Sequence, residues 1–224
     1  MTEHAPVLAT IEARTHGRYL VSAPHAAGPW PLLVGFHGYA ETADDHLHAL
    51  QSIPGAREWL LVSVQALHPF YTRKDRVVAN WMTRDDRDLA IADNLDYVGR
   101  VLNRIKAGYT VDRLVFSGFS QGGAMAYRAA AHYPCDGLIV LAADVPPDIV
   151  TQRLAPLPPV LLGRGTNDDW YTEAREAADL VELARIDARV ETCVFEGGHE
   201  WTDSFRDAAG GFLHRLRSRG HDAD

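Results

Sequence analysis

The stretch Gly118-Phe119-Ser120-Gln121-Gly122 decides the fold that the sequence predicts. It follows an apolar run at residues 113–116 and precedes a run of small residues with helical character at 123–131. A serine flanked by glycines at such a point is typical of a nucleophile elbow, in which a strand turns sharply into a helix and holds the serine at the apex. The flanking glycines are needed because side chains there would collide with the neighbouring strand or helix. The stretch therefore predicts an α/β fold with a serine nucleophile.

Two polar turns further along the chain supply the partners that a serine nucleophile requires. A serine hydroxyl needs a histidine as its base, and the histidine needs a carboxylate to hold its tautomer. In this architecture the order along the chain is serine, acid, histidine. Asp168 follows the apolar run at residues 159–162, and His199 follows the strand-like run at 189–195. Since parallel strands end at one edge of a sheet, we expect Ser120, Asp168 and His199 to meet there.

Two other aspartates compete with Asp168 for the role of the acid. Asp144 follows the predicted strand at residues 137–141 and lies at the same edge of the expected sheet. Asp169 is the second choice within the turn, and we expect its side chain to point elsewhere. Asp168 is preferred for its place in the Gly-x-x-Asp turn.

An oxyanion hole is expected from two backbone amides. In this architecture one comes from the residue after the nucleophile and one from the loop after the third strand. The buried-looking strand at residues 32–36 runs into the pair His37-Gly38, so the two donors are the N–H groups of Tyr39 and Gln121. Gly38 lets the backbone approach a substrate closely. His37 is interpreted as a hydrogen-bonding residue of the loop and not as the base.

The chain resembles the phospholipase/carboxylesterase family of α/β-hydrolases, which also contains acyl-protein thioesterases and lies close to dienelactone hydrolases. The resemblance implies a serine hydrolase of short-to-medium acyl esters or thioesters that needs no cofactor, with a homodimer as a family-level possibility. Tyr39 departs from the pattern, because many relatives carry a small or aliphatic residue there. The segments that carry the resemblance are His37-Gly38, Gly118 to Gly122, Gly165 to Asp168 followed by Trp170-Tyr171, and Gly198-His199.

Length, charge and hydropathy narrow the classes of protein. The 224 residues, of which 46% are hydrophobic and 23% charged, fit one domain spanning residues 1–224. The net charge of −8 offers no basic surface for nucleic acid. No stretch approaches the ~18 consecutive apolar residues of a membrane span. Residues 1–4 have neither a basic nor an apolar leader segment, so we expect a cytoplasmic protein.

Strand-like and helix-like segments alternate along the chain, which predicts an α/β-hydrolase fold with a mostly parallel central sheet, helices on both faces and little or no cap. At the amino end, apolar alternation at residues 7–11, followed by a turn into residues 19–21, predicts an edge hairpin. Further strands are expected near 32–36, 60–64, 113–116, 137–141, 159–162 and 189–195, a long helix over 84–106, and a last helix whose apolar face runs from Trp201 to Leu216.

The irregular segment at residues 65–83 separates a strand from the long helix and contains several aromatic residues. Segments of this length inside compact domains are usually functional or mobile. Phe70, Tyr71 and Trp81 either line a flap over an acyl pocket or anchor the segment to its own core, and Trp81 lies nearest to the core because the long helix follows it. Trp170, directly after the acid turn, is a further expected substrate contact.

A group of acidic and histidine residues early in the chain does not predict a metal site. The spacing His-x-His on a helix sends the two rings of His46 and His48 to different faces. Asp44 and Asp45 fit the solvated start of a helix. We therefore expect neither a metal nor an organic cofactor.

Three functions remain open from the sequence. The first is a hydrolase of small-molecule esters or thioesters acting through Ser120, His199 and Asp168 and an acyl-enzyme intermediate. The second keeps these residues but cleaves amides, as an amidase or a peptidase. The third is a noncatalytic binding protein of the same fold. The joint presence of the three residues and both elbow glycines favours catalysis.

Overall fold

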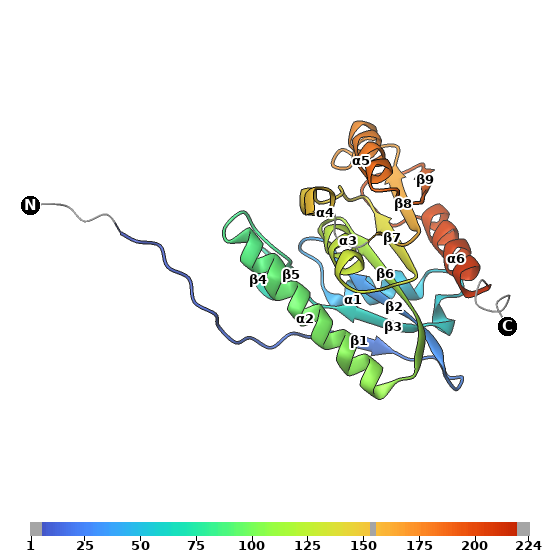
Figure 1. Cartoon of the computed structure of the whole chain (residues 1–224), viewed down its shortest axis with the longest axis horizontal. Coiled ribbons are helices and arrows are strands. Elements are labelled where there is room, and N and C mark those ends of the chain that lie inside the picture. Colours follow the sequence, from blue (N-terminus) through green and yellow to red (C-terminus); the bar gives the residue numbers. More distant parts are fainter. Residues whose placement is uncertain (1–5, 153–155, 219–224) are drawn as a thin grey trace, which may run out of the picture.

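The computed structural model describes residues 6–152 and 156–218. A seven-stranded sheet runs through it in the order β1-β3-β2-β6-β7-β8-β9 (Figure 1). β1 pairs antiparallel with β3, and the other neighbouring strands pair parallel. The carboxyl ends of the parallel strands therefore lie at one edge of the sheet, which is where ligands bind in open α/β folds.

The sheet strands are β1 (Tyr19–Ser22), β2 (Trp30–Phe36), β3 (Leu60–Val64), β6 (Val111–Phe119), β7 (Gly137–Leu141), β8 (Val160–Gly165) and β9 (Val190–Phe195). The helices are α1 (Ala43–Gln51), the 3₁₀ turn η1 (Ala56–Glu58), α2 (Arg87–Gly108), α3 (Gln121–His132), α4 (Pro147–Gln152), α5 (Glu173–Arg185) and α6 (Asp203–Ser218). A separate two-stranded sheet consists of β4 (His68–Tyr71) and β5 (Val77–Asn80).

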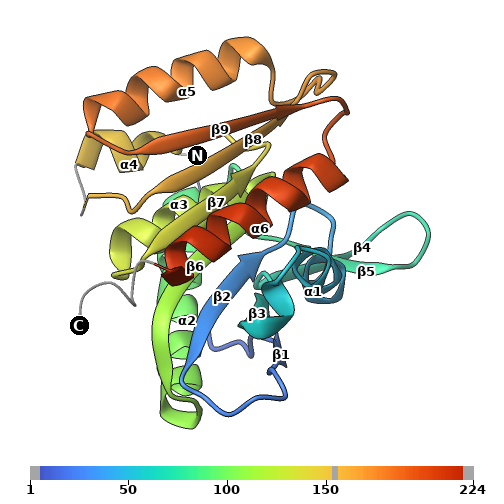
Figure 2. The ribbon, with the colours of Figure 1, turned by 90° about the vertical axis from the view of Figure 1, so that its right-hand side faces the viewer.

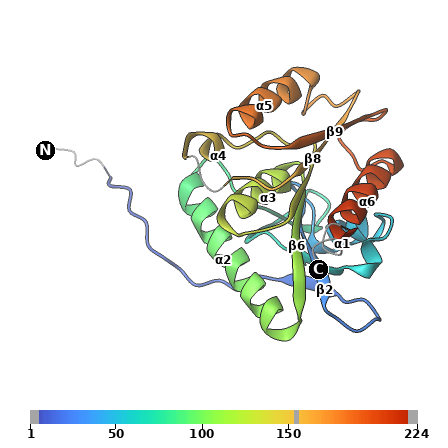
Figure 3. The ribbon, with the colours of Figure 1, turned by 45° about the vertical axis from the view of Figure 1, so that its right-hand side comes forward.

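Helices cover both faces of the sheet. α1 and α6 lie on one face, and α2 and α3 on the other, with α4 and α5 beside α3 (Figures 2 and 3). Close contacts agree with this arrangement: the backbone of β2 at Gly35 touches Leu50 of α1, and that of β7 at Gly137 touches Leu216 of α6. Because both faces are covered, the central strands are buried along nearly their whole length, which explains their continuous apolar sequences.

The expected edge hairpin at the amino end is wrong. Only its second strand forms, as β1, while residues 6–18 adopt no helix or strand and run away from the body of the molecule (Figure 1). At Gly17 the backbone lies directly against the ring of Tyr97 in α2, where a Cβ atom would lie 2.1 Å from the ring. The Tyr97 hydroxyl also donates to the Arg18 carbonyl oxygen at 2.6 Å. These contacts carry the chain over α2 instead of back along β1.

The segment at residues 65–83 is more regular than the sequence indicates. β4 and β5 pair antiparallel in a hairpin that projects from the body beside α1 (Figure 2). An isolated β-bridge between Glu41 and Ala79 ties this hairpin to the loop after β2. In the described ranges, this hairpin is the insertion between β3 and α2, and no helical cap is inserted there.

None of the described helices combines the length and apolarity needed to cross a lipid bilayer. The amino-terminal residues 1–4, on which the prediction of a cytoplasmic protein partly rests, lie outside the described residues.

Candidate active site

Ser120 lies at the junction of β6 and α3 in a conformation that few serines adopt. Its backbone has φ 52° and ψ −123°, a region that costs free energy for any residue with a side chain and persists only where surrounding contacts impose it. Two contacts do so here. The Ser120 N–H donates to the Leu141 carbonyl oxygen of β7 at 2.9 Å, and the Ser120 carbonyl oxygen accepts from the Gly123 N–H at 2.9 Å. The hydroxyl is thereby held at the carboxyl edge of the sheet.

The two elbow glycines are required by close backbone contacts. A Cβ atom on Gly118 would lie 2.2 Å from the carbonyl oxygen of Gly122. A Cβ atom on Gly122 would lie 2.0 Å from the carbonyl oxygen of Phe36 in β2. Neither oxygen can move freely, because each belongs to the backbone of a buried element. The elbow can therefore form only with glycine at both positions.

We expect Gly122→Ala to destabilise the fold by about 3 kcal/mol or more, because the new methyl group overlaps backbone that cannot yield. Urea unfolding, followed by circular dichroism, measures the change. Gly108→Ala is the matched control, because nothing lies within 4 Å of a Cβ atom there and alanine favours a helix by up to about 1 kcal/mol. Equal urea midpoints for Gly122→Ala and the unsubstituted protein would contradict the contact described above.

Asp168 lies in the turn after β8, and both of its carboxylate oxygens are engaged. Oδ1 accepts from the N–H groups of Trp170 at 2.8 Å and Tyr171 at 2.7 Å. Oδ2 accepts from Nδ1 of His199 at 2.8 Å. The Asp168 side chain is fully buried. The backbone thus fixes one oxygen and leaves the other aimed at the histidine.

The turn of Asp168 and the loop of His199 lie against each other. The Asn167 N–H donates to the Gly197 carbonyl oxygen at 2.8 Å, and the backbone at Gly165 is so close to Gly198 that a Cβ atom would lie 2.3 Å from the Gly198 oxygen. These contacts hold the loops after β8 and β9 together. The acid and the histidine are therefore brought together by backbone contacts as well as by their own hydrogen bond.

Two buried side-chain contacts join α5 to the Asp168 turn and to the end of β8 before it. The buried Arg164 guanidinium donates to Glu176 of α5 at 2.7 Å and to the Gly165 carbonyl oxygen at 3.2 Å. The buried Tyr171 hydroxyl donates to Asp179 of α5 at 2.9 Å. Burial raises the pKa of Asp179 to about 6. These contacts fix the position of the strand end from which the Asp168 turn departs.

His199 is held beside the elbow. Its ring packs against the ring of Phe119, the neighbour of Ser120, with the centroids 4.9 Å apart. Because Nδ1 faces the Asp168 carboxylate, it carries the proton, and Nε2 is left to accept one. The side chain is 29% exposed, so a substrate can reach it. No hydrogen bond joins Ser120 to His199 within the described residues, and such bonds commonly shorten only when substrate binds.

The competing aspartates have other surroundings. Asp144 pairs with the Arg175 guanidinium at 2.8 Å, and both side chains are about half exposed. Asp169, whose side chain was expected to point elsewhere, is exposed. Of the acids weighed from the sequence, Asp168 is the one bonded to His199.

The loop after β2 leaves one particular amide unpaired. The Gly38 N–H donates to Oε2 of Glu41 at 2.7 Å, the Ala40 N–H to the Ala79 carbonyl oxygen at 3.1 Å, and the Glu41 N–H to the Gly38 carbonyl oxygen at 3.3 Å. Among the described residues, neither the Tyr39 N–H nor the Gln121 N–H donates to a protein acceptor. Those are the two amides expected to form an oxyanion hole.

His37 supports this loop as a neutral, buried residue. Its Nε2 accepts from the Ala66 N–H at 3.0 Å, so its Nδ1 carries the proton and donates to the Gly38 carbonyl oxygen at 2.7 Å. Burial lowers the pKa of His37, which keeps the ring uncharged. The interpretation of His37 as a hydrogen-bonding residue of the loop is confirmed.

Glu41 is a residue of this region that sequence analysis missed. It is half-buried, and burial raises the pKa of its carboxyl, while the bond from the Gly38 N–H partly opposes that rise. The one local signal for it is a carboxylate three residues after Gly38, within reach of that N–H group in a tight turn. Through this bond Glu41 fixes the Gly38 amide.

The expected substrate-contact residues divide into exposed and buried ones. Tyr39, Tyr71 and Trp170 are exposed by 60%, 73% and 63%, respectively. The half-buried Phe70 stacks on Tyr39 with the ring centroids 5.5 Å apart. Trp81 is fully buried, so the structure places it in the core and not on a substrate wall. Its place just before α2, which the sequence already marked as close to the core, accounts for this correction.

The early acidic and histidine residues make separate contacts. Asp45 pairs with Arg76 and caps α1 through Thr42, and His48 is exposed at the surface of α1. His46 is buried, and its burial lowers its pKa to about 3. Within the described ranges no group of three or more His, Cys, Asp or Glu residues is placed to hold a metal ion.

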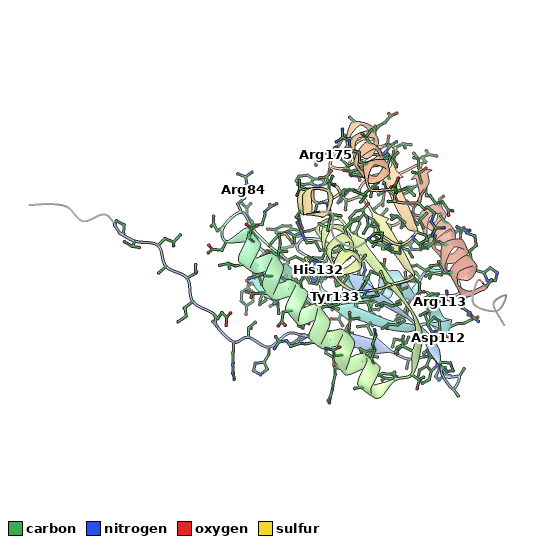
Figure 4. The ribbon with its side chains drawn as sticks, viewed as in Figure 1. Arg84, Asp112, Arg113, His132, Tyr133 and Arg175 are labelled. Carbon is green, nitrogen blue, oxygen red and sulfur yellow. The ribbon has the colours of Figure 1, made fainter. Side chains whose placement is uncertain are left out.

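Two cavities, of about 330 Å³ and 590 Å³, open at the amino ends of the strands, away from the candidate site. The larger one is lined in part by Asp112 and Arg113 at the start of β6. Figure 4 places these two residues at the opposite end of the molecule from Arg175, whose guanidinium lies 5.6 Å from the ring centroid of Trp170. Neither cavity includes Ser120, Asp168 or His199.

Solved structures with the same fold include several esterases. The chain superposes on the Bacillus cereus carboxylesterase with a TM-score of 0.72 at 20% identity, covering 89% of this chain and 94% of that one. For Zea mays acyl-protein thioesterase 2 the TM-score is 0.70 at 18% identity, covering 90% and 99%. For a phospholipase/carboxylesterase from Dyadobacter fermentans it is 0.69 at 19% identity, covering 91% and 99%.

These likenesses establish the α/β-hydrolase fold, which the sequence predicted. They also confirm, at the level of fold, the expected resemblance to the phospholipase/carboxylesterase group. No protein-family model matches the sequence, and no curated protein matches it significantly.

Proposed function

We propose that this chain is a serine hydrolase that cleaves carboxylic esters or thioesters of short-to-medium acyl chains. The observation that carries the proposal is the bond from His199 Nδ1 to the buried Asp168, made beside a serine that the elbow holds in an uncommon conformation. The solved structures that share the fold include carboxylesterases and a thioesterase, which supports hydrolysis as the reaction class.

Catalysis begins with proton transfer from Ser120. His199 Nε2 accepts the hydroxyl proton as the oxygen attacks the acyl carbonyl, and Asp168 stabilises the imidazolium that forms. The tetrahedral intermediate collapses as His199 protonates the leaving alcohol or thiol, which produces an acyl-enzyme. His199 then activates a water molecule that hydrolyses the acyl-enzyme and restores Ser120. Every proton in these steps is carried by the chain's own residues, the substrate or water.

The negative charge that develops on the carbonyl oxygen is stabilised by the amides of Tyr39 and Gln121. Their N–H groups have no protein acceptor among the described residues, while the neighbouring amides of Gly38, Ala40 and Glu41 are all bonded. Unpaired, fixed donors of this kind favour the transition state because they need no reorganisation as charge develops. The positive end of α3, which begins at Gln121, acts in the same direction.

The acyl chain lies against the exposed aromatic residues that surround the elbow. Tyr39 and Phe70 form one stacked pair, and the exposed Trp170 follows the acid turn. Tyr71 is exposed next to Phe70 in β4, on the opposite face of the hairpin, because successive side chains of a strand alternate. Tyr39, Phe70 and Trp170 offer apolar contact to a short or medium chain.

The first test combines a covalent probe with turnover. A fluorophosphonate should label Ser120, as located by peptide mass spectrometry, and a series of p-nitrophenyl esters from acetate to decanoate should be hydrolysed with a chain-length optimum. A matched anilide separates the ester hydrolase from an amidase or peptidase, because faster anilide turnover would reverse the assignment. Absence of both labelling and turnover would leave the noncatalytic binding protein.

A further inference from the structure

Trp81 bonds through three polar groups to the loop at residues 37–41 after β2, which we call the oxyanion loop, to the elbow and to α2. Its indole N–H donates to the His37 carbonyl oxygen at 2.8 Å. Its backbone N–H donates to Oε1 of Gln121 at 2.8 Å. Its carbonyl oxygen accepts from the buried Asn94 of α2 at 2.8 Å. One fully buried residue is thus bonded to both segments that carry the unpaired amides, and a helix holds it in place.

The Gln121 side chain completes the link. Besides accepting from Trp81, it donates from Nε2 to the Met82 carbonyl oxygen at 2.9 Å. The side-chain amide therefore binds two successive backbone groups after β5. Because the backbone N–H of the same residue is one of the two unpaired donors, any shift of residues 81–82 is transmitted to that donor.

We propose that Trp81 and the Gln121 side chain are positioning residues that fix the distance between the Tyr39 and Gln121 amides in the oxyanion hole. This inference rests on the proposed function, in which those amides bind the oxyanion. We call the unit of Trp81 and Gln121 the clamp.

The clamp acts close to both donors. The His37 carbonyl oxygen that the indole binds belongs to the peptide unit immediately before the one that carries the Tyr39 N–H. The His37 imidazole of the loop itself holds the carbonyl oxygen of that second unit, so two consecutive peptide units are fixed, the first by Trp81 and the second by His37. A planar trans peptide points its N–H opposite to its carbonyl oxygen, so holding one aims the other.

Burial requires some acceptor for the Trp81 indole N–H, but it does not require that acceptor to belong to the oxyanion loop. Trp81 also packs edge-to-face against the ring of Phe36 and at a tilt against that of His37, with centroids 5.4 Å and 5.2 Å apart. Trp59 is equally buried before β3, and its indole N–H makes no hydrogen bond within the described residues.

The first experiment compares Trp81→Phe with Trp59→Phe in the full chain. Each variant replaces a buried indole by a smaller ring, but only Trp81→Phe removes a bond to the oxyanion loop. We expect Trp81→Phe to lower kcat about 10- to 100-fold with KM changed by less than about 3-fold, since loss of a whole oxyanion donor costs about 10²–10³ in kcat. Trp59→Phe should leave kcat within about 3-fold.

A second readout reports on the oxyanion hole directly. An aryl trifluoromethyl ketone forms a hemiketal with the serine, whose oxygen carries a negative charge like that of the tetrahedral intermediate. Its inhibition constant should rise by the same factor as kcat falls in Trp81→Phe. A purely structural role would lower thermal stability without moving that constant at temperatures well below unfolding.

Gln121→Met tests the other half of the clamp without touching the core, because Gln121 is only half-buried and its backbone N–H is kept. It should lower kcat about 10-fold or more, and the double variant with Trp81→Phe should lose less than the product of the two single losses, because the two residues act as one unit. If Trp81→Phe does not fold, the kcat and the ketone inhibition constant of Gln121→Met test the clamp in its place.

The outcomes separate the two proposals. Suppose that the wild-type protein hydrolyses esters and that Trp81→Phe is folded. Unchanged kcat and unchanged ketone inhibition in Trp81→Phe would then overturn the clamp alone. If Trp81→Phe does not fold, the same unchanged values in Gln121→Met would overturn it. An equal kcat loss in Trp59→Phe would do the same, because it would show a general effect of core disruption. A wild-type protein that neither hydrolyses esters nor binds the ketone would overturn the proposed function, and the clamp with it.

Discussion

Replacing Ser120 by alanine is expected to lower kcat for ester hydrolysis by at least ~10⁴-fold while the protein remains folded. The substitution removes the attacking oxygen and leaves the histidine, the acid and the two unpaired amides in place. Alanine has the same Cβ as serine and accepts the positive φ of the elbow at a similar cost. Spontaneous hydrolysis of the activated ester by water sets the lowest rate that the assay can resolve.

The assay is hydrolysis of the preferred p-nitrophenyl ester, with fluorophosphonate labelling measured in the same preparations. Ser117→Ala is the matched control, because this serine lies in β6, which leads to Ser120, is fully buried, and its hydroxyl has no hydrogen-bond partner among the described residues. It should retain activity within about 3-fold, since no bond is lost. Activity of purified Ser120→Ala near that of the wild type would exclude Ser120 as the nucleophile.

Asp168→Asn is expected to lower kcat by roughly 10⁴-fold through the tautomer of His199. Oδ1 of residue 168 accepts from two backbone N–H groups, so an asparagine places its oxygen there and turns its NH₂ toward His199. Nδ1 of the ring must then accept a hydrogen bond, which moves the proton to Nε2. A ring protonated on Nε2 cannot accept the proton of Ser120.

Asp144→Asn is the control for this prediction. Asp144 was the other acid at the same sheet edge, but its carboxylate pairs with Arg175 in an exposed ion pair, which contributes little. It should change kcat less than about 3-fold. Esterase rates across pH 6–9, with thermal unfolding for each variant, separate a lost catalytic step from a lost fold. A larger loss in Asp144→Asn than in Asp168→Asn would reverse the choice of acid.

Much of the fold could be predicted because apolar runs in a parallel sheet are continuous. The predicted strand at residues 60–64 is β3 without change, and the strand at 137–141 is β7. The long helix begins and ends within three residues of the expected bounds. The strand predicted at residues 7–11 does not form, because alternation of apolar and polar residues does not by itself provide a neighbouring strand to pair with. The chain at Gly17 is held against Tyr97 of α2, and no local pattern reveals that contact.

The positions of Ser120, Asp168 and His199 could be predicted because each directly follows a strand of the same parallel sheet. The sequence preferred Asp168 over Asp144 for its Gly-x-x-Asp turn, although both follow such strands, and the structure adds the bond from His199 to Asp168. Glu41 and the side chain of Gln121 were missed because their partners, Gly38 and residues 81–82, form bonds that leave no periodic pattern. Trp81 was assigned to a substrate wall or the core, and its burial decides for the core.

From the sequence we could predict the strands of the parallel sheet, the long helix, the elbow and the two polar turns that carry Asp168 and His199. These features depend on local patterns of apolar residues, glycines and polar turns, which nearby residues largely specify. The folded structure adds the bond from His199 to Asp168, the lack of a protein acceptor for the Tyr39 and Gln121 amides among the described residues, and the bonds of Trp81 to both sides of the site. Each of these depends on contacts between segments far apart in the chain, which exist only once the sheet has assembled.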